Sequence, residues 1–472
     1  MNGKIKNLTG ATIIAESGTK YTLKEQIGYG AQGVVYEENS GKFMVKLYYP
    51  SNCQSLDEDM VEKLNFIRDV KMPKNFVSII DVITSPYVGY VMEKVSNHHS
   101  LNSYLIPDES SSFSEWYNRG LGLYERIFIG YIIAKAFGEL EKNNLSYCDI
   151  SGNNILVRTG KSASVKMIDV DNIYIAGKGK ATVLGTPRYI APEVISRQKN
   201  PDVLSDNYSL AVILFELLRV GHPYISDDIL DGTPEDEEMA LAGNVDYVNE
   251  GNSSNMLPAS VTLTESLKEL FERCFVDGKK NRLKRPSATE FEYALLDASN
   301  KLVKCQSCGA WHYLRKKGKD FEECPWCDAP SQDTARINFY DILYEGEDYK
   351  NASVINKKLV NSYVLKESRK NTIKSLYVLR FDDLGKEKRS SENYLTIANN
   401  ENGYHIYNEF CKKGIVVKQY GKTEYMNIEN NKALKLNSGD EIYFEIKDNA
   451  AIKIECGGKP YSFIRMARFM EV

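Results

Sequence analysis

A glycine-rich turn between two strand-like segments is the feature that most restricts the fold of this chain. The segment IGYGAQGVVY places Gly28, Gly30 and Gly33 in G-x-G-x-x-G spacing, and Val35 follows. Glycines allow backbone N–H groups to approach phosphates without an intervening Cβ atom. Strand patterns flank the glycines on both sides, which argues against a dinucleotide-binding fold, where a helix follows them. A plain glycine-rich hairpin is the alternative interpretation.

A lysine follows the glycines at the distance of a further strand. In FMVKLY, Lys46 lies between apolar residues. It is either a solvated surface lysine or a lysine that reaches the α- and β-phosphates of a nucleotide. The second role requires an anionic residue to orient the amine. Glu62, in an amphipathic helix predicted between Leu56 and Val70, is the candidate, with Glu58 as the fallback, although either glutamate could belong to a solvated helix face.

Length and composition indicate a globular protein of several domains. The chain has 472 residues, which suggests two to four domains, and 42% of its residues are hydrophobic and 26% charged. The net charge of −4 gives no reason to expect a nucleic-acid partner. The start of the chain lacks a basic segment followed by an apolar one, and the apolar runs are too short or carry Glu216. We therefore expect a cytoplasmic protein with neither a signal peptide nor a membrane partner.

Three polar residues mark a second group of motifs. SYCDISGNNILV places Asp149 five positions before Asn154, at the start of an apolar segment, and VKMIDVDN carries Asp169 after the next strand pattern. A turn residue that caps a strand would explain any one of them. The series GYVMEKV, YCDISGNN, VKMIDVDN, GTPRYIAPE, SDNYSLAVILFELL and RPSATEF nevertheless follows the glycines and Lys46 in order. In this order the chain resembles the eukaryotic-type protein kinases over residues 20 to about 298.

The resemblance implies an α+β, two-lobed protein kinase fold over residues 1–298, with an N-lobe of about residues 1–95 and a C-lobe of about residues 96–298. It implies that Asp149 accepts or orients the acceptor hydroxyl, and that Lys46 contacts ATP. Asn154 and Asp169 would hold Mg²⁺, since oxygen ligands suit this hard cation. The remaining implied positions are the gatekeeper Met92, the hinge Glu93 to Val95, the activation-segment residues Thr182, Thr186 and Glu193, Arg285 as the partner of Glu193, and Asp206 as the residue that holds the catalytic-loop backbone.

Three positions depart from the family's pattern. Cys148 replaces the arginine that usually pairs with an activation-loop phosphate, which predicts a kinase of the non-RD type. Ser151 replaces a lysine that steadies the transferred phosphate, and Lys178, Lys180 and Arg188 are nearby cations that could substitute. Asp171 replaces the glycine of the D-F-G turn but leaves Asp169 in place.

The predicted function is a Mg²⁺-ATP-dependent serine/threonine protein kinase that acts on a protein substrate. GTPRYIAPE resembles the Ser/Thr-type activation segment, and Asn153 stands where many tyrosine kinases have arginine. The alternative is an ATP-binding pseudokinase that serves as a signalling scaffold. The presence of Lys46, Asp149, Asn154 and Asp169 together favours the enzyme.

Two cysteine pairs indicate a zinc ribbon over residues 301–330. The segment CQSCGAWHYLRKKGKDFEECPWC presents Cys305, Cys308, Cys324 and Cys327 as two C-x-x-C pairs. Four thiolates close a tetrahedral site, so the expected Zn²⁺ is structural. A redox C-x-x-C is the alternative, and His312 is a competing ligand.

The last part of the chain, residues 335–472, reads as a β-rich domain. Short strand patterns alternate with Asn- and Gly-rich turns, which favours a sandwich or barrel. LKLNSGDEIYF is similar to the last strands of forkhead-associated domains, but a general β-sandwich that binds a regulatory protein is the prediction. Kinase, ribbon and β domain together resemble soluble bacterial kinases of eukaryotic type.

Overall fold

The computed structural model describes most of the chain and divides it into two compact units, Met1–Ala298 and Ser299–Val472. Thr182, Lys178 and Lys180 lie outside the described residues. The described residues are 5–30, 32–50, 54–107, 112–175, 185–314, 316–317, 320–321, 323–330, 334–346, 350, 352–366, 370–374, 393–410, 415–444, 452–456 and 459–471.

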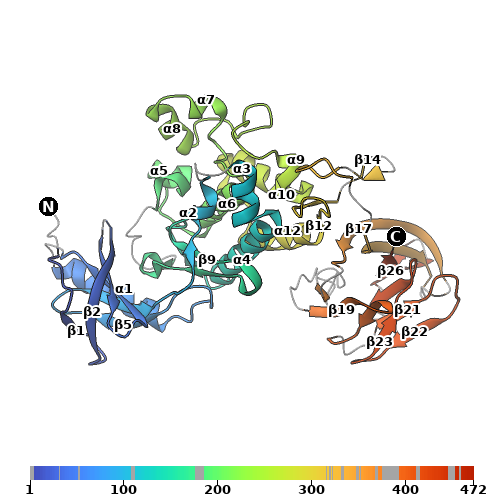
Figure 1. Ribbon diagram of the computed structural model, residues 1–472, viewed down its shortest axis with the longest axis horizontal. Helices are drawn as coiled ribbons and strands as arrows, with labels where there is room; N and C mark the ends of the chain where they lie inside the picture. Colours follow the sequence, from blue (N-terminus) through green and yellow to red (C-terminus); the bar gives the residue numbers. More distant parts are fainter. Residues whose placement is uncertain are drawn as a thin grey trace. The chain divides into compact units, whose positions relative to one another are not determined.

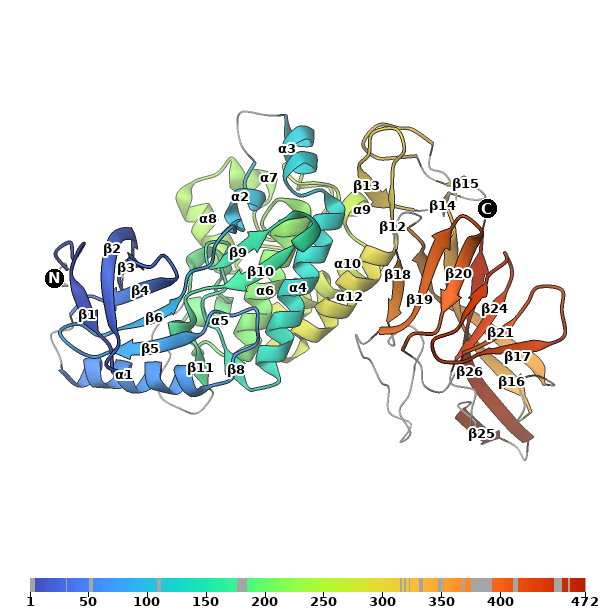
Figure 2. The same cartoon turned by 60° about the horizontal axis from the view of Figure 1, so that its bottom comes forward.

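The first unit begins with a six-stranded antiparallel sheet and one helix (Figures 1 and 2). The strand order is β1-β2-β3-β4-β6-β5, and α1 connects β4 to β5 and packs against β5. Apolar residues that alternate along the strands, including Leu23, Tyr36 and Val45, form the buried core of the sheet. The elements are β1 (Thr12–Ile14), β2 (Lys20–Tyr29), β3 (Gly33–Glu38), β4 (Phe43–Tyr48), α1 (Gln54–Asp69), β5 (Ile79–Ile83) and β6 (Gly89–Glu93).

The rest of this unit is mainly helical, and α6 runs through its centre (Figure 2). Every residue of α6 from Ser205 to the end is buried, as expected for a helix that is apolar around most of its circumference. A capping box between Asp202 and Ser205 fixes its start. The helices are α2 (Asn102–Leu105), α3 (Phe113–Gly120), α4 (Leu123–Glu141), α5 (Pro192–Ile195), α6 (Val203–Arg219), α7 (Asp227–Leu230), α8 (Pro234–Leu241), α9 (Ala259–Thr262), α10 (Glu265–Glu272), α11 (Gly278–Lys280) and α12 (Ala288–Asn300).

Short strands in the helical half bring two predicted site residues together. β9 follows Asn154 directly, β10 ends two residues before Asp169, and the two strands pair antiparallel with Ile155 opposite Met167. The Ile168 N–H donates to the Asn154 carbonyl, 2.9 Å away. The strands are β7 (His99–Ser100), β8 (Leu145–Ser146), β9 (Ile155–Arg158), β10 (Ser164–Met167) and β11 (Tyr174–Ile175). The two-lobed α+β arrangement implied by the resemblance is thus confirmed.

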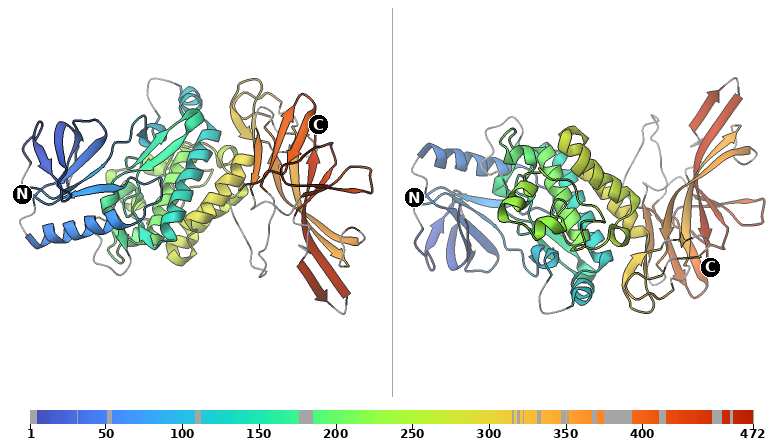
Figure 3. Two further views of the ribbon diagram at one scale, coloured as in Figure 1. Left: turned by 90° about the horizontal axis from the view of Figure 1, so that it is seen from below. Right: turned by 90° about the horizontal axis from the view of Figure 1, so that it is seen from above.

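The second unit consists of short hairpins and two sheets. One sheet has the order β17-β16-β26-β24-β21-β22, with β25 paired to β26, and the other has the order β18-β19-β20-β23. Apolar residues of both sheets, such as Phe339, Phe469, Ile397 and Ile406, form one buried core, so the sheets make a sandwich. The β25–β26 hairpin projects from the rest of its sheet (Figure 3). The β-rich prediction for this region is confirmed.

The strands of the second unit are β12 (Leu302–Lys304), β13 (Trp311–Tyr313), β14 (Lys316–Lys317), β15 (Asp320–Phe321), β16 (Arg336–Glu345), β17 (Ser353–Val364), β18 (Asn371–Lys374), β19 (Asn393–Asn400), β20 (Gly403–Tyr407), β21 (Ile415–Lys418), β22 (Tyr425–Ile428), β23 (Ala433–Lys435), β24 (Glu441–Phe444), β25 (Ile452–Cys456) and β26 (Lys459–Met470). Among the described residues of the whole chain, no helix is both long and apolar enough to cross a membrane.

Candidate active site

The three glycines of the first motif lie in the β2–β3 hairpin and have different surroundings. A Cβ atom on Gly33 would lie 2.1 Å from the backbone oxygen of Leu47, so this glycine permits the close approach of β4. A Cβ atom on Gly28 or Gly30 would meet no atom within 4 Å. These two glycines therefore border open space, while Val35 pairs with Lys46 across β3 and β4.

Lys46 extends from β4 to two carboxylates. Its Nζ lies 3.0 Å and 3.1 Å from the two Asp171 oxygens and 3.2 Å from Asp169 Oδ1. The Lys46 side chain is 8% exposed. Burial disfavours its charged form, but the two carboxylates outweigh burial, so the pKa of Lys46 lies above its ordinary value.

The expected pair between Lys46 and Glu62 is not formed. Among the described residues, the carboxylates paired with Lys46 are those of Asp169 and Asp171. Glu62 instead lines a cavity of about 510 Å³ together with Glu58, the end of β4 and the turn that connects β5 to β6. Its neighbour Lys63 is the α1 residue on which the charges of Asp171 and Lys46 act. Successive helical residues point about 100° apart, so the predicted helix was right but the residue facing the site was not.

The predicted hinge follows β6. Met92 is buried and pairs with Met44 of β4. Glu93 ends β6 and is exposed, while Val95 is half-buried just beyond the strand. The Lys94 N–H, between these two, donates to the carbonyl of Lys42 at 2.9 Å.

The loop between β8 and β9 is held through its backbone. The Asp206 carboxylate, from the first turn of α6, accepts hydrogen bonds from the backbone N–H groups of Tyr147 and Cys148, the latter at 3.0 Å. Cys148 has a left-handed φ of 66°, which a non-glycine residue rarely adopts. Burial raises the pKa of Asp206 to about 7, although the hydrogen bonds from the two N–H groups act to lower it. The predicted contact of Asp206 with this loop is confirmed.

Asp149 is fixed from both sides. The Thr186 hydroxyl donates to its Oδ1 at 2.8 Å, and the Asn154 amide nitrogen donates to its Oδ2 at 3.0 Å. The same nitrogen donates to the Asp149 carbonyl at 2.9 Å. Because the Asn154 nitrogen is committed to Asp149, its amide oxygen is the atom that can ligate a cation.

Asp169 begins a 3₁₀ turn, η2 (Val170–Asn172), in a left-handed conformation with φ of 59°. Its side chain is 32% exposed, whereas that of Asp171 is 2% exposed. Burial raises the pKa of Asp169 although the charge of Lys46 opposes the shift. An oxygen pair from Asn154 and Asp169, whose segments are hydrogen-bonded to each other, fits the ligand chemistry of Mg²⁺.

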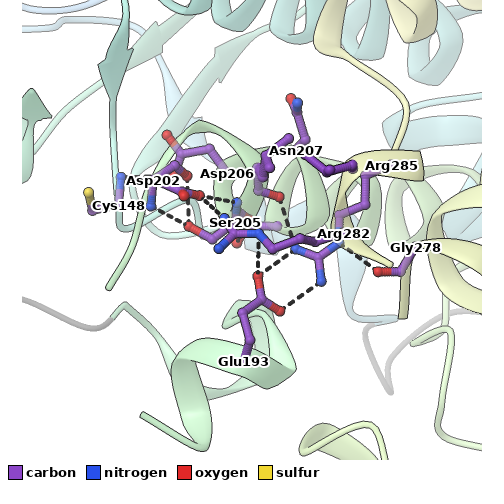
Figure 4. Close-up of polar contacts among 12 residues, drawn as sticks. Cys148, Glu193, Asp202, Ser205, Asp206, Asn207, Gly278, Arg282 and Arg285 are labelled. Carbon is purple, nitrogen blue, oxygen red and sulfur yellow. Dashed lines mark hydrogen bonds and ion pairs between the residues drawn. The ribbon is translucent and has the colours of Figure 1, made fainter. Parts of the chain in front are cut away.

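An ion pair ties the end of the activation segment to the helical half (Figure 4). Arg285 donates from Nη1 and Nη2 to the two oxygens of Glu193, both at 2.7 Å. The same guanidinium donates to the carbonyls of Gly278 and Leu204. The side chain of Arg285 is 1% exposed, so the predicted Glu193–Arg285 pair is both confirmed and buried.

The four ribbon cysteines come together in the second unit. Their Sγ atoms all lie within 4.8 Å of one another, with Cys305–Cys327 at 3.7 Å and Cys308–Cys324 at 3.8 Å. Ligands at about 2.3 Å from a tetrahedral zinc are separated by about 3.8 Å, so the four thiols fit this ion. His312 is buried, and its Nδ1 lies 3.1 Å from the Tyr313 carbonyl.

Each cysteine pair sits in the same backbone turn. The N–H groups of Cys305 and Cys324 donate to the carbonyls five residues later, those of Ala310 and Ala329. Gly309 and Asp328, which directly follow the second cysteine of each pair, both have left-handed φ angles. Two matching turns thus present the sulfurs to one point.

Asp171 and its two tyrosine partners, Tyr48 and Tyr90, were not predicted as site residues. The sequence showed Asp171 only as a replacement for glycine. One available signal was its place in VKMIDVDNIY, because an acidic residue in an apolar segment requires a partner. Which residue would be that partner depends on strands β4 and β6, which only the fold brings together.

Comparison with known proteins agrees with this geometry. The protein kinase domain family matches residues 21–294, more than half of the chain, and the chain belongs to this family.

Two relatives are more specific. The chain is 26% identical over 280 residues to the probable serine/threonine-protein kinase fhkD of Dictyostelium discoideum, covering 55% of this chain and 34% of that protein. It is 22% identical over 362 residues to protein kinase YegI of Escherichia coli K12, covering 71% of this chain and 52% of that protein. The matches thus span between a third and about half of the length of these relatives.

Proposed function

We propose that this protein kinase is a Mg²⁺-ATP-dependent serine/threonine kinase that transfers the γ-phosphate of ATP to a protein hydroxyl. The observation that carries the proposal is the fixed position of Asp149. Asn154 and Thr186 hold its carboxylate, and Asp206 holds the backbone of its loop. Such a carboxylate can accept or orient the proton of an acceptor hydroxyl.

The residues that would hold the nucleotide surround this carboxylate. Gly28 and Gly30 leave open space at the β2–β3 hairpin, and Lys46 and Asp169 are linked by an ion pair. Val35, Met92, Glu93 and Val95 would line the base and ribose end of the site. When bound, Mg²⁺-ATP supplies the phosphoryl group and the cation that neutralises its charge. Asn154 and Asp169 would ligate that cation, and Lys46 would orient the phosphates.

A serine or threonine acceptor is supported by Thr186. Its hydroxyl reaches Asp149 as expected for a Ser/Thr-type activation segment. The name of the relative from Dictyostelium discoideum points to the same class of acceptor.

Activity without activation-loop phosphorylation is supported by Cys148. This residue is buried, and its backbone N–H is bonded to Asp206. A thiol in this place supplies no cation for a phosphate on Thr182 or Thr186. The protein is therefore proposed to be a non-RD kinase with basal activity.

An ion pair argues against Arg188 as the cation that replaces the missing catalytic-loop lysine. Its Nε lies 2.5 Å from Glu216 Oε1, and Glu216 is buried and also accepts from Tyr189. This engagement favours Lys178 or Lys180 for the role.

A structural Zn²⁺ is proposed at Cys305, Cys308, Cys324 and Cys327, supported by the sulfur distances and the two matching turns. Four thiolates leave no position for a catalytic water. The β-sandwich after it is proposed to bind a regulatory protein.

The test is phosphate incorporation by the full chain. Wild type, Asp149→Asn and the control Asp228→Asn, which changes a carboxylate in α7, are incubated with Mg²⁺, γ-labelled ATP and generic protein acceptors. We expect labelled serine or threonine with wild type and the control, and a loss of about 100-fold or more with Asp149→Asn. If wild type binds Mg²⁺-ATP but labels no acceptor, the proposed kinase activity is wrong and a pseudokinase that serves as a signalling scaffold is favoured.

A further inference from the structure

The amine of Lys46 is held by a carboxylate that does not come from α1. Both oxygens of Asp171 lie within hydrogen-bonding distance of Lys46 Nζ, at 3.0 Å and 3.1 Å. Asp169, two residues earlier, offers one oxygen at 3.2 Å. Asp171 is therefore the closer partner of the lysine, and it binds the amine through both of its oxygens.

Two tyrosines complete the surroundings of the Asp171 carboxylate. Tyr90 donates to Oδ1 at 3.0 Å, and Tyr48 donates to Oδ2. Tyr90 stands directly opposite Lys46 on the neighbouring strand, and Tyr48 lies two residues after Lys46 on the same strand. Their rings also lie 5.9 Å and 5.7 Å from Lys46 Nζ. Strands β4 and β6 thus present a lysine and two hydroxyls to one carboxylate.

The charge of Asp171 is stabilised by these partners. Burial disfavours the ionised carboxylate, but Lys46 and the two tyrosine hydroxyls place one cation and two hydrogen-bond donors on its oxygens. A buried carboxylate whose two oxygens both accept hydrogen bonds is a built site and not a chance contact.

Helix α1 carries a lysine, Lys63, near the turn of Asp171. α1 contacts the η2 turn that carries Asp171. Burial lowers the pKa of Lys63 on α1, and the charge of Asp171 acts against that shift. Glu62 instead lines the cavity at the turn between β5 and β6. The family's pattern has a glutamate on this helix and a glycine in the turn, whereas here the turn itself carries the aspartate that pairs with Lys46.

We propose that Asp171 is the residue that positions Lys46 for the phosphates of ATP, in place of a glutamate on α1. This inference rests on the proposed function, because it concerns the nucleotide lysine of that site. Asp171 and the metal-ligand candidate Asp169 belong to one short turn, so the lysine and the metal ligand are oriented together. The position of α1 no longer decides whether Lys46 is correctly placed.

The experiment compares three variants of the full chain. Asp171→Asn removes the charge but keeps the size, Glu62→Gln does the same to the residue expected from the family's pattern, and Asp69→Asn is the control. Asp69 ends α1 and its side chain is 72% exposed. For each variant, Kd for Mg²⁺-ATP, kcat, KM for ATP and KM for the protein acceptor are measured.

We expect Asp171→Asn to lower kcat/KM for ATP by about 10- to 100-fold, because a misplaced positioning group costs this much. KM for the protein acceptor should stay unchanged, which a general loss of structure would not allow. Glu62→Gln should cost less than about threefold, and Asp69→Asn should match wild type. A larger loss with Glu62→Gln than with Asp171→Asn, or equal rates for Asp171→Asn and Asp69→Asn, would overturn the proposal.

A second variant covers the case in which Asp171→Asn does not fold. Tyr90→Phe keeps the carboxylate and removes one of its hydrogen bonds, and it should weaken Mg²⁺-ATP binding by a smaller factor, about two- to fivefold. An unchanged Kd in Tyr90→Phe would count against Asp171 as the positioning residue.

The outcomes for Asp171 and for the kinase function are separable. If wild type binds Mg²⁺-ATP but transfers no phosphate, the proposed kinase activity is wrong. A higher Kd for Mg²⁺-ATP in Asp171→Asn would still support the positioning role. If wild type transfers phosphate and Asp171→Asn behaves as the control, the enzyme stands and the positioning role fails.

Discussion

Two anchoring systems in residues 1–298 differ in how closely they follow the protein kinase family. One holds the Asp149 loop through Asp206 and the end of the activation segment through the Glu193–Arg285 pair, and it uses the residues that the family's pattern implies. The other holds the amine of Lys46, and it uses Asp171 in place of Glu62. The same fold thus has one anchoring system made of the expected residues and one whose carboxylate comes from the η2 turn and not from α1.

The difference follows from what each anchor has to do. Asp206 and Arg285 bind backbone N–H and C=O groups, whose directions are fixed by the path of the chain. Few positions can meet that demand. Lys46 needs only a negative charge within a few ångströms, and Coulomb attraction does not depend on the element that supplies the charge. A charge-bearing anchor can therefore be relocated more easily than one that binds backbone.

The largest expected effect concerns Asp149, whose loop is held through its backbone by Asp206. Asp149→Asn should lower phosphotransfer by about 10²- to 10⁴-fold, because the variant cannot accept the acceptor's proton. Kd for Mg²⁺-ATP, measured by calorimetry, should change little, since Lys46 keeps its own anchor. A parallel loss of binding and transfer would show that the two anchoring systems are not separate.

Breaking the Glu193–Arg285 pair should cost stability. Arg285→Gln leaves Glu193, whose side chain is 13% exposed, without its two guanidinium hydrogen bonds, which should lower the free energy of unfolding by about 3 kcal/mol. Urea unfolding of the full chain measures this. The control is Lys268→Gln, which breaks the exposed Lys268–Glu265 pair and should cost less than about 1 kcal/mol. Equal effects of the two variants would contradict a buried anchor.

His222 extends the backbone-binding system and gives it a pH dependence. Its Nε2 donates to the Arg188 carbonyl at 3.0 Å, and its Nδ1 accepts from the Tyr224 N–H at 3.3 Å. Burial, helped by the charge of Arg188, lowers the pKa of His222 to about 3. Below about pH 6.5, His222 is protonated in the unfolded chain but stays neutral in the folded chain. The contribution of His222 to the free energy of unfolding is therefore fully present above about pH 6.5 and falls by about 1.4 kcal/mol per pH unit as the pH drops toward 3.

Calorimetric unfolding between pH 7.5 and pH 4.5 checks this sign. His222→Asn should flatten the pH dependence, while His99→Asn, which changes an exposed histidine, should leave it as in wild type. A steeper dependence in His222→Asn would show that another group sets the acid sensitivity.

The smallest expected effect on catalysis comes from the cysteine cluster of the other unit. Metal analysis of the full chain should find about one equivalent of zinc, because four thiolates close one tetrahedral site. Removing the zinc with a chelator, with Mg²⁺ in excess, should increase protease cleavage within residues 301–330 and leave phosphotransfer unchanged. Less than half an equivalent of metal in the untreated chain would count against the site, and a loss of phosphotransfer would count against a purely structural role.

The sequence predicted the motifs whose spacing is local. Asp149 and Asn154 are five residues apart in one loop, and the two C-x-x-C pairs each form their own turn, so short-range geometry was enough to group them. The kinase fold and the contacts of Asp206 and Glu193 were predicted because the family's pattern specifies both partners.

The lysine anchor could not be predicted in the same way. Whether Glu62 or Lys63 faces Lys46 depends on the rotation of α1, and one residue of helix turns a side chain by about 100°. Asp171 becomes a partner only after β4, β6 and the η2 turn meet. In the second unit, alternating apolar residues predicted strands, but the order β17-β16-β26-β24-β21-β22 joins segments more than 100 residues apart. Such pairings are set by the whole core and not by any local pattern.

The most direct test of the relocated anchor is a crystal structure of the full chain with Mg²⁺ and a non-hydrolysable ATP analogue. We expect Lys46 Nζ to contact the phosphates while staying within hydrogen-bonding distance of Asp171, with Asn154 and Asp169 on the cation and Glu62 directed away. A structure in which Lys46 pairs with Glu62 and Asp171 has left the amine would contradict the account.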